Sequence, residues 1–220
     1  MEILTSQDEE KIVAELLKGK TVVFPTETSY GLLCDATNEG AVRNVFEIKG
    51  RSRAKAVLVV VSNVEMAKEY LKWNEVVDKI ARKYWPGALT VVGEVVPPLL
   101  REDRRRGLGP ALGKRDRRRG LAEGVVSEDK TVAVRVTGYG PLKSLVEKVG
   151  RPLVATSANV SGKGEIYSGT EMILKLGKQN FQPDYVVDFG VLPKRKPTTI
   201  VRVLKNKVEI LRKGEVIVKL

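Results

Sequence analysis

Residues 21–51 read TVVFPTETSYGLLCDATNEGAVRNVFEIKGR, the stretch with the most informative local pattern in the chain. The apolar residues 21–24 predict a short strand, and Pro25 ends it because proline has no N–H to donate to a strand ladder. Residues 26–29 then add three hydroxyl side chains and one carboxylate. This part of the sequence therefore predicts a strand whose end carries a polar turn.

Two cations close the same stretch, at the end of a predicted helix. The helix is expected from about Ala41 to Ile48, and Gly50 marks its end. Lys49 and Arg51 flank that glycine. Small hydroxyls and closely spaced cations suit a site that holds a small polar substrate beside a phosphate. Each half of the pattern is also compatible with a purely structural role, as an ordinary turn and an ordinary basic helix end.

Strands and helices alternate through the rest of the chain. The first helix is expected to begin at a capping box of Ser6 and Glu9, and two later helices at Ser62 and Asn74. Further helices are predicted over 141–149 and 171–176, and strands over 56–61, 89–96, 131–136, 153–156, 185–188, 198–204 and 208–211. This alternation predicts an α/β fold with helices on both faces of a sheet. The last two strands read as a hairpin, which makes the predicted sheet mixed parallel and antiparallel.

Length and composition predict one globular domain over residues 1–220. Apolar residues make up 42% of the chain and charged residues 30%, the balance of a soluble folded protein. No apolar run is long enough to cross a bilayer, and the N-terminus lacks the pattern of a signal peptide. The protein is therefore expected in the cytoplasm, away from membranes.

The chain contains no histidine and a single cysteine, Cys34. This composition excludes an internal disulfide, the Ser-His and Cys-His nucleophile pairs and the usual zinc sites. Any catalysis must then depend on positioning, cations, hydroxyls, backbone amides, carboxylates or a loosely held Mg²⁺. Phosphoryl and nucleotidyl transfer need little more, because they are accelerated mainly by alignment and charge stabilisation.

The net charge of +12 is concentrated in one segment. Residues 101–120 hold nine Lys or Arg and three acids, so they supply half of the net charge. Within them REDRRRGL at 101–108 is repeated as KRDRRRGL at 114–121. This composition predicts an exposed insertion over about 97–130 rather than part of a core. It is either a neutral loop, or a lid or an arm that faces tRNA.

Seven motifs occur in the order found in the YrdC-type threonylcarbamoyl-AMP synthases, and the chain resembles the single-domain form of that family. They are PTETSYG, KGR, WPGALT, TVAVR, ATSANVSG, TTIV and ILRKG, and they span Thr21 to Gly214 except residues 97–130. The resemblance implies a twisted mixed sheet around a basic concave site. It also implies an enzyme that joins L-threonine, bicarbonate or CO₂, and ATP into threonylcarbamoyl-AMP and pyrophosphate, with Mg²⁺ held mainly by the ATP phosphates.

The resemblance also implies the biological setting and the roles of individual residues. The product would serve the t⁶A modification of tRNA, either on tRNA directly or through a tRNA threonylcarbamoyltransferase complex. The family pattern places Lys49 and Arg51 at the reacting phosphates. The implied ATP-binding residues are Lys49, Arg51, Lys55, Thr131, Ser157, Asn159 and Arg212. The implied threonine-binding residues are Thr28, Arg135 and Thr198, with Arg135 at the substrate carboxylate.

Two departures from the family pattern concern the neighbourhood of the threonine pocket. Lys55-Ala56-Val57 replaces the common Asn-Pro-Leu or Lys-Pro-Leu, and Val60 replaces a histidine of some relatives.

Two other classes of protein share parts of this pattern. A non-catalytic module that binds double-stranded RNA or tRNA would explain the positive charge, but only 5% of the residues are aromatic and no RNA-binding motif is present. A carbamoyl-transfer domain of the hydrogenase-maturation type would normally lie in a longer chain with zinc-binding cysteines. The synthase is therefore the favoured function.

Overall fold

The computed structural model describes residues 1–52, 56–96, 120–177, 179–205 and 207–219. In this part of the chain the strands are β1 (Glu2–Leu4), β2 (Val22–Pro25), β3 (Tyr30–Asp35), β4 (Val59–Val61), β5 (Leu89–Glu94), β6 (Thr131–Val136), β7 (Leu153–Ser157), β8 (Tyr185–Val187), β9 (Thr199–Leu204) and β10 (Lys207–Arg212). The helices are α1 (Glu9–Leu17), α2 (Glu39–Lys49), α3 (Val64–Tyr70), α4 (Glu75–Tyr84), α5 (Gly140–Val149) and α6 (Gly169–Leu176), with a short 3₁₀ helix at Ser6–Asp8.

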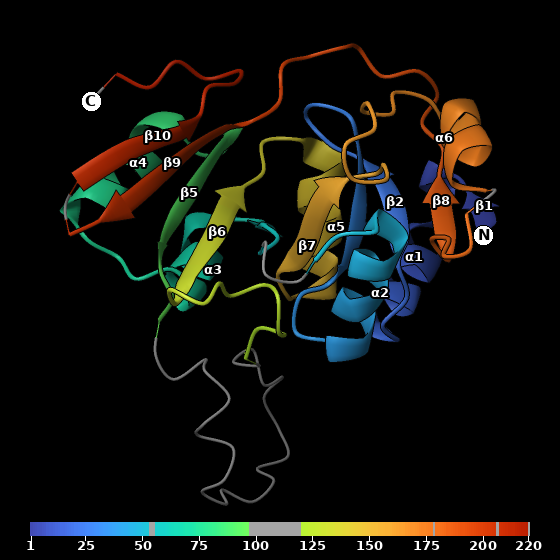
Figure 1. The fold of residues 1–220 in the computed structure, drawn as a ribbon, viewed down its shortest axis with the longest axis horizontal. Helices are drawn as coiled ribbons and strands as arrows, with labels where there is room; N and C mark the ends of the chain where they lie inside the picture. Colours follow the sequence, from blue (N-terminus) through green and yellow to red (C-terminus); the bar gives the residue numbers. More distant parts are fainter. Residues whose placement is uncertain (53–55, 97–119, 178, 206, 220) are drawn as a thin grey trace, which may run out of the picture.

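These strands form one sheet in the spatial order β1-β8-β2-β3-β7-β4-β6-β5-β9-β10 (Figure 1). The pairs β1–β8, β2–β8, β4–β6 and β5–β9 are parallel, and the remaining neighbours are antiparallel. The sequence-based expectation of a mixed α/β sheet is confirmed.

Helices cover the two faces of the sheet unequally. Around β2, β3, β7 and β4, the helices α1 and α5 pack on one face and α2 packs on the other (Figure 1). Leu33 belongs to the same core cluster as the buried residues of α1 and α5. The preceding residue, Leu32, belongs to the cluster that contains Phe46 of α2. Both residues are fully buried, so this half of the sheet is covered on both faces.

The other half of the sheet has one open face. Val91, Val134 and Val201 point from β5, β6 and β9 into the core that includes α3 and α4. Side chains alternate along a strand, so Thr90 and Arg135 point the opposite way. That second face is the floor of the cavity described below.

Two predicted strand regions differ from the structure. The sequence did not mark a separate strand after the turn at 26–29, yet Tyr30–Asp35 forms β3 and pairs with β2 as a hairpin. Both faces of β3 are buried, so it lacks the polar alternation that signals a hairpin strand. The predicted strand 56–61 is also too long, because only Val59–Val61 enters the sheet and Ala56, Val57 and Leu58 line the cavity.

Two predicted helix caps are wrong by one residue. The capping box consists of Thr5 and Asp8, not Ser6 and Glu9, and it opens the 3₁₀ helix that leads into α1. Asn63 rather than Ser62 caps α3, because its side-chain oxygen accepts the Met66 N–H at 2.8 Å. The cap of α4 at Asn74 is confirmed.

Some expectations fall on residues that the structure does not describe. Lys55 is one of them, and so are residues 97–119, which contain most of the arginine repeat. The described end of the predicted insertion contradicts the expectation of exposure, because Leu121, Ala122 and Val125 are buried in the core. Among the described residues, no helix has the length and apolar character needed to span a membrane.

Candidate active site

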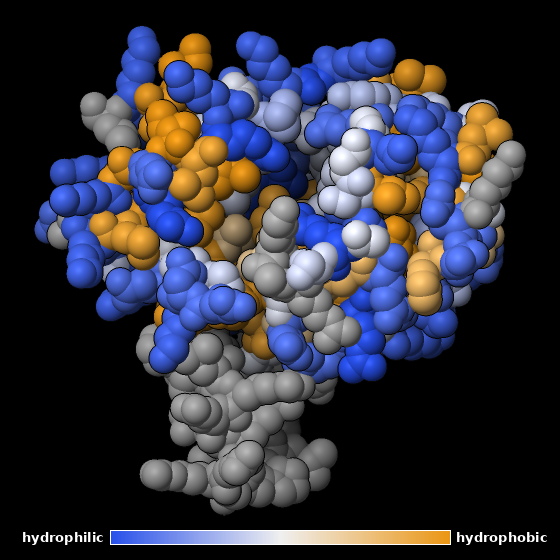
Figure 2. Space-filling view, in the orientation of Figure 1, coloured by the Kyte–Doolittle hydropathy of each residue, from blue (hydrophilic) through white to orange (hydrophobic). Residues whose placement is uncertain are grey.

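A cavity of about 520 Å³ lies on the open face of β5, β6 and β9. Figure 2 shows this face of the molecule hollowed between the part that carries β9 and β10 and the part that carries α2. Of the residues predicted from sequence, six line the cavity: Thr28, Arg51, Arg135, Ser157, Thr198 and Arg212. Strands and loops far apart in sequence thus bring three guanidinium groups and several hydroxyls to one place.

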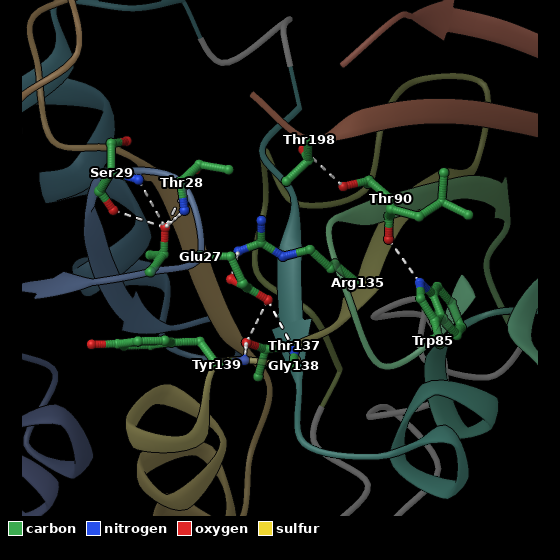
Figure 3. A network of polar contacts seen from close by, with 12 residues as sticks. Glu27, Thr28, Ser29, Trp85, Thr90, Arg135, Thr137, Gly138, Tyr139 and Thr198 are labelled. Carbon is green, nitrogen blue, oxygen red and sulfur yellow. Dashed lines mark hydrogen bonds and ion pairs between the residues drawn. The ribbon is translucent and has the colours of Figure 1, made fainter. Parts of the chain in front are cut away.

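Arg135 lines the cavity from β6, and Figure 3 shows its side chain reaching toward Glu27. It is only 4% exposed, and its guanidinium Nη2 lies 3.4 Å from the Glu27 carboxylate. Burial lowers the pKa of Arg135, and the nearby Glu27 opposes that shift. A buried guanidinium with one loose acidic partner retains donors for an anionic ligand, and Arg135 Nε has no hydrogen-bond partner among the described residues.

Arg212 enters the cavity from the end of β10, on the opposite wall. Its Nε donates to the Thr198 carbonyl and its Nη2 to Thr198 Oγ1, both at 2.9 Å. Thr198 Oγ1 also lies 3.5 Å from Thr90 Oγ1 (Figure 3). Thr198 lines the cavity as predicted, but its hydroxyl holds Arg212 in this structure. Burial is the main cause that lowers the pKa of Arg212.

The turn between β2 and β3 brings hydroxyl groups to a third wall. Thr26 Oγ1 donates to the Ser29 carbonyl at 2.8 Å and accepts the Thr28 N–H at 3.3 Å. The Thr26 N–H also donates to the Ser29 carbonyl, so the four-residue turn is closed tightly. Thr28 is then held at the cavity surface by the hydroxyl of Thr26 in its own turn.

Lys49 occupies a different environment from the one predicted. Its ammonium donates to the Ser157 carbonyl at 2.6 Å, the Asn159 carbonyl at 2.8 Å and Asn159 Oδ1 at 3.2 Å. The side chain is only 3% exposed, unlike the cation of an ordinary basic helix end. All three donors of Lys49 are directed at the loop after β7, and it does not line the cavity.

Burial affects the charge of this lysine. Desolvation, with a smaller contribution from the positive charge of Arg51, lowers the pKa of Lys49 to about 8. The chain from Ser157 to Ser161 covers this end of α2, because the Ser161 N–H also donates to the Lys49 carbonyl at 3.0 Å. The position of Lys49 at the last helical residue was visible in the sequence, but the loop that covers it was not.

Arg51 is the cation of the pair that faces the cavity. Its Nη2 donates to the Ala56 carbonyl at 3.2 Å, and its Nε has no hydrogen-bond partner among the described residues. The side chain is partly exposed, and burial lowers its pKa. Arg51 therefore matches the expected phosphate-facing cation more closely than Lys49 does.

The predicted amide and hydroxyl residues after β7 divide into two positions. Ser157 lines the cavity, and its hydroxyl donates to Asn159 Oδ1 at 2.6 Å. Asn159 is buried and does not line the cavity, and its side-chain amide donates to the Lys163 carbonyl. Lys49, Ser157 and Asn159 form one network beside the cavity, and only Ser157 reaches its surface.

Thr131 lies outside the lining of the cavity. Its hydroxyl donates to Asp129 at 2.7 Å and contacts the Ser127 hydroxyl at the start of β6.

Two acidic residues of this region were not predicted from the sequence. Glu27 was seen only as part of a polar turn, and Glu165 lines the cavity, where Tyr167 OH donates to its carboxylate at 2.8 Å. Neither carries a local sequence signal that separates it from an ordinary surface acid.

Among the described residues, no group of three or more His, Cys, Asp or Glu side chains gathers in a geometry suited to a metal ion. The described lining of the cavity contains one carboxylate, that of Glu165. A Mg²⁺ ion takes about six oxygen ligands, so this one carboxylate could supply only a small part of its coordination.

The fold and cavity define an α/β domain with a cavity lined by three guanidinium groups on an open sheet face. Comparison with known proteins agrees with that class. The family model Sua5_yciO_yrdC, described as "Telomere recombination", matches residues 14–108 and 109–214. The chain belongs to this Sua5/YciO/YrdC family.

Individual relatives extend the comparison. A threonylcarbamoyl-AMP synthase of Pseudoalteromonas translucida is 30% identical over 198 residues, which cover 88% of this chain and 91% of the relative. A threonylcarbamoyl-AMP synthase of Pyrococcus abyssi is 35% identical over 153 residues, 66% of this chain and 37% of that one. The crystal structure of P. abyssi Sua5 complexed with L-threonine is similar with a TM-score of 0.79 at 25% identity, covering 97% of this chain and 58% of that one.

Proposed function

We propose that this chain is an L-threonylcarbamoyl-adenylate synthase. The observation that carries the proposal is the convergence of Arg51, Arg135 and Arg212 on one cavity that also presents the hydroxyl turn of β2 and β3. The proposal is supported by the names of the full-length relatives and by the similarity to a structure that was solved with L-threonine. Its substrates would be ATP, L-threonine and bicarbonate or CO₂.

The proposed reaction needs no enzymic nucleophile. The threonine amine adds to CO₂ and loses a proton, which gives a carbamate. A carbamate oxygen then attacks the α-phosphorus of ATP, and the bond to the β-phosphate oxygen breaks to release pyrophosphate. This makes the enzyme a nucleotidyltransferase, and it agrees with a chain that has no histidine.

The residues divide into two groups in this proposal. Arg135 would bind the threonine carboxylate with two parallel hydrogen bonds, and Thr28 would contact the same substrate from its turn. Arg51 and Arg212 would stabilise the negative charge that develops on the phosphate oxygens. Lys49, with Ser157 and Asn159, would shape the nucleotide side of the cavity.

Mg²⁺ would neutralise part of the triphosphate charge and help pyrophosphate to depart. Glu165, the one carboxylate on the described cavity lining, is suited to orient a magnesium-bound water.

The remaining parts of the proposal concern the cell. The product would pass to tRNA or to a tRNA threonylcarbamoyltransferase complex, and the protein would act in the cytoplasm.

Release of pyrophosphate from ATP tests the function. We expect turnover only when L-threonine and bicarbonate are both supplied, because the carbamate is the group that attacks the phosphorus. Omission of either one serves as the control. Equal turnover without threonine would exclude the proposed reaction.

A further inference from the structure

We infer that Glu27 is a positioning residue, which orients the Arg135 guanidinium for the carboxylate of the amino-acid substrate. The inference rests on the proposed function for the identity of that substrate. Glu27 belongs to the turn that presents the hydroxyls, whereas Arg135 belongs to β6 on the cavity floor. The pair thus joins two walls of the cavity that are distant in sequence (Figure 3).

One oxygen of Glu27 is fixed by the chain that follows β6. Its Oε1 accepts the Thr137 hydroxyl at 2.7 Å and the Gly138 N–H at 3.0 Å. The Tyr139 N–H in turn donates to Thr137 Oγ1 at 3.2 Å. Two donors on one oxygen leave the carboxylate little freedom to rotate, so the direction of its second oxygen is set by the backbone.

The second oxygen faces Arg135. Glu27 Oε2 lies 3.4 Å from Arg135 Nη2, and this oxygen has no hydrogen-bond partner among the described residues. The side chains are 11% and 4% exposed, respectively, so little water competes for either charge. An ion pair of this length in a nearly buried place directs the guanidinium while leaving hydrogen-bonding capacity on both groups.

This arrangement prepares Arg135 for an anionic ligand. Without a fixed acid behind it, a buried guanidinium would have to be ordered when the substrate binds, which lowers affinity. Arg135 lines the cavity and its contact with Glu27 is long, so an incoming carboxylate meets an oriented guanidinium that can still donate hydrogen bonds. Glu27 does not line the cavity, and it would act through Arg135 rather than by touching the substrate.

Glu27→Gln tests the inference because it keeps the size of the side chain and removes its charge. If its oxygen retains the bonds from Thr137 and Gly138, its amide nitrogen faces Arg135 as a second donor. If the amide turns over, those two bonds are lost instead. In both cases Arg135 loses its acidic partner.

The readout is the ratio of the affinities for L-threonine and L-threoninamide, measured by calorimetry with ATP absent. The amide lacks the negative charge that Arg135 would bind. We expect the wild-type protein to prefer L-threonine, and we expect Glu27→Gln to reduce that preference by about tenfold while changing the ATP affinity less than twofold. Glu47→Gln, which removes an exposed carboxylate of α2 that does not line the cavity, is the control and should leave the ratio unchanged.

The outcomes distinguish a failure of the proposed function from a failure of the role inferred for Glu27. Wild-type protein that binds neither amino acid would contradict the proposed function. If the wild type prefers L-threonine over L-threoninamide and Glu27→Gln shows the same preference, the role inferred for Glu27 is wrong. If circular dichroism shows that Glu27→Gln is unfolded, Glu27→Asp replaces it, because the shorter acid keeps the charge and withdraws it from Arg135. A preference reduced about threefold then supports the inference, and an unchanged preference overturns it.

Discussion

The two cations that flank Gly50 illustrate how much a single residue's environment depends on distant chain. The sequence shows Lys49 and Arg51 as equivalent members of a basic pair. In the structure Lys49 is buried under the loop after β7, whereas Arg51 reaches the cavity. A sequence pattern locates such residues, but the partner that covers one of them lies more than a hundred positions away.

Lys49→Met should destabilise the protein by about 2–4 kcal/mol, because it leaves the carbonyls of Ser157 and Asn159 without their donor. The free energy of unfolding, measured in denaturant, checks this. Arg43→Met, at an exposed position of the same helix, is the matched control. A loss below about 0.5 kcal/mol would contradict the network described for Lys49.

The lowered pKa of Lys49 also predicts a pH dependence. The folded pKa is about 8, while an unfolded lysine titrates near about 10.4, so between these values the unfolded state holds more protons. The stability of the wild type relative to Lys49→Met should therefore rise by about 1–3 kcal/mol from pH 8 to pH 10. The difference between their unfolding free energies at the two pH values measures it. A constant or falling difference would show that the pKa of Lys49 is not depressed.

Arg51→Ala should lower turnover about tenfold to a thousandfold and cost about 1 kcal/mol of stability or less. The residue is partly exposed and makes one hydrogen bond to the Ala56 carbonyl, so little of the fold depends on it. Steady-state pyrophosphate release and thermal melting check the two parts, with Arg43→Ala as control. If the variant melts at a much lower temperature but keeps full activity per folded molecule, the role of Arg51 is structural rather than catalytic.

At the scale of elements, the turn between β2 and β3 and the loop after β7 bring the polar groups to the cavity. The hydroxyls of the turn were predicted, but its second strand was not, because Tyr30–Asp35 is buried on both faces and shows no alternation. The open face of β5, β6 and β9 was not predicted, because the alternation of strands and helices indicated helices on both faces of the whole sheet. Which strands lie beside it could not be read, because strand order depends on long-range pairing.

Gly31→Ala should disturb the hydroxyl turn without unfolding the sheet. A Cβ at Gly31 would lie 2.8 Å from Thr26 Cγ2, so Thr26 has to move together with the turn that it closes. We expect a loss of about 1–3 kcal/mol and a larger rise in KM for threonine than for ATP. Gly164→Ala is the control, since nothing lies within 4 Å of its Cβ position. Equal KM effects on both substrates would contradict the placement of threonine at this turn.

Asn159→Ala and Ser157→Ala should weaken nucleotide binding more than threonine binding, with Asn159→Ala also lowering stability. Asn159 is buried and accepts from both Lys49 and Ser157, whereas Ser157 lies at the cavity surface. Separate calorimetric titrations of ATP and L-threonine check the order. Weaker threonine binding with intact ATP binding would reverse the assignment of this wall.

At the scale of the whole molecule, the cavity is a product of topology. Arg135, Arg212 and Arg51 come from β6, the end of β10 and the residue after the α2 cap, and the mixed sheet order places them around one open face. Motif order along the chain identified the family and most of the lining residues. It did not indicate that Thr198 holds Arg212, that Thr131 lies apart, or that Glu27 faces Arg135, because each of these depends on side-chain contacts across strands.

The most direct test of the central claim is to identify the product. The protein is incubated with ATP, Mg²⁺, L-threonine and ¹³C-bicarbonate, and the mixture is analysed at once by mass spectrometry. The account predicts a threonine adduct of AMP that carries the ¹³C label in its carbamoyl carbon, formed in proportion to pyrophosphate. The opposite result would be pyrophosphate and free AMP formed at the full rate without any labelled adenylate. If this occurs under conditions in which the intact adduct is stable, it contradicts the account.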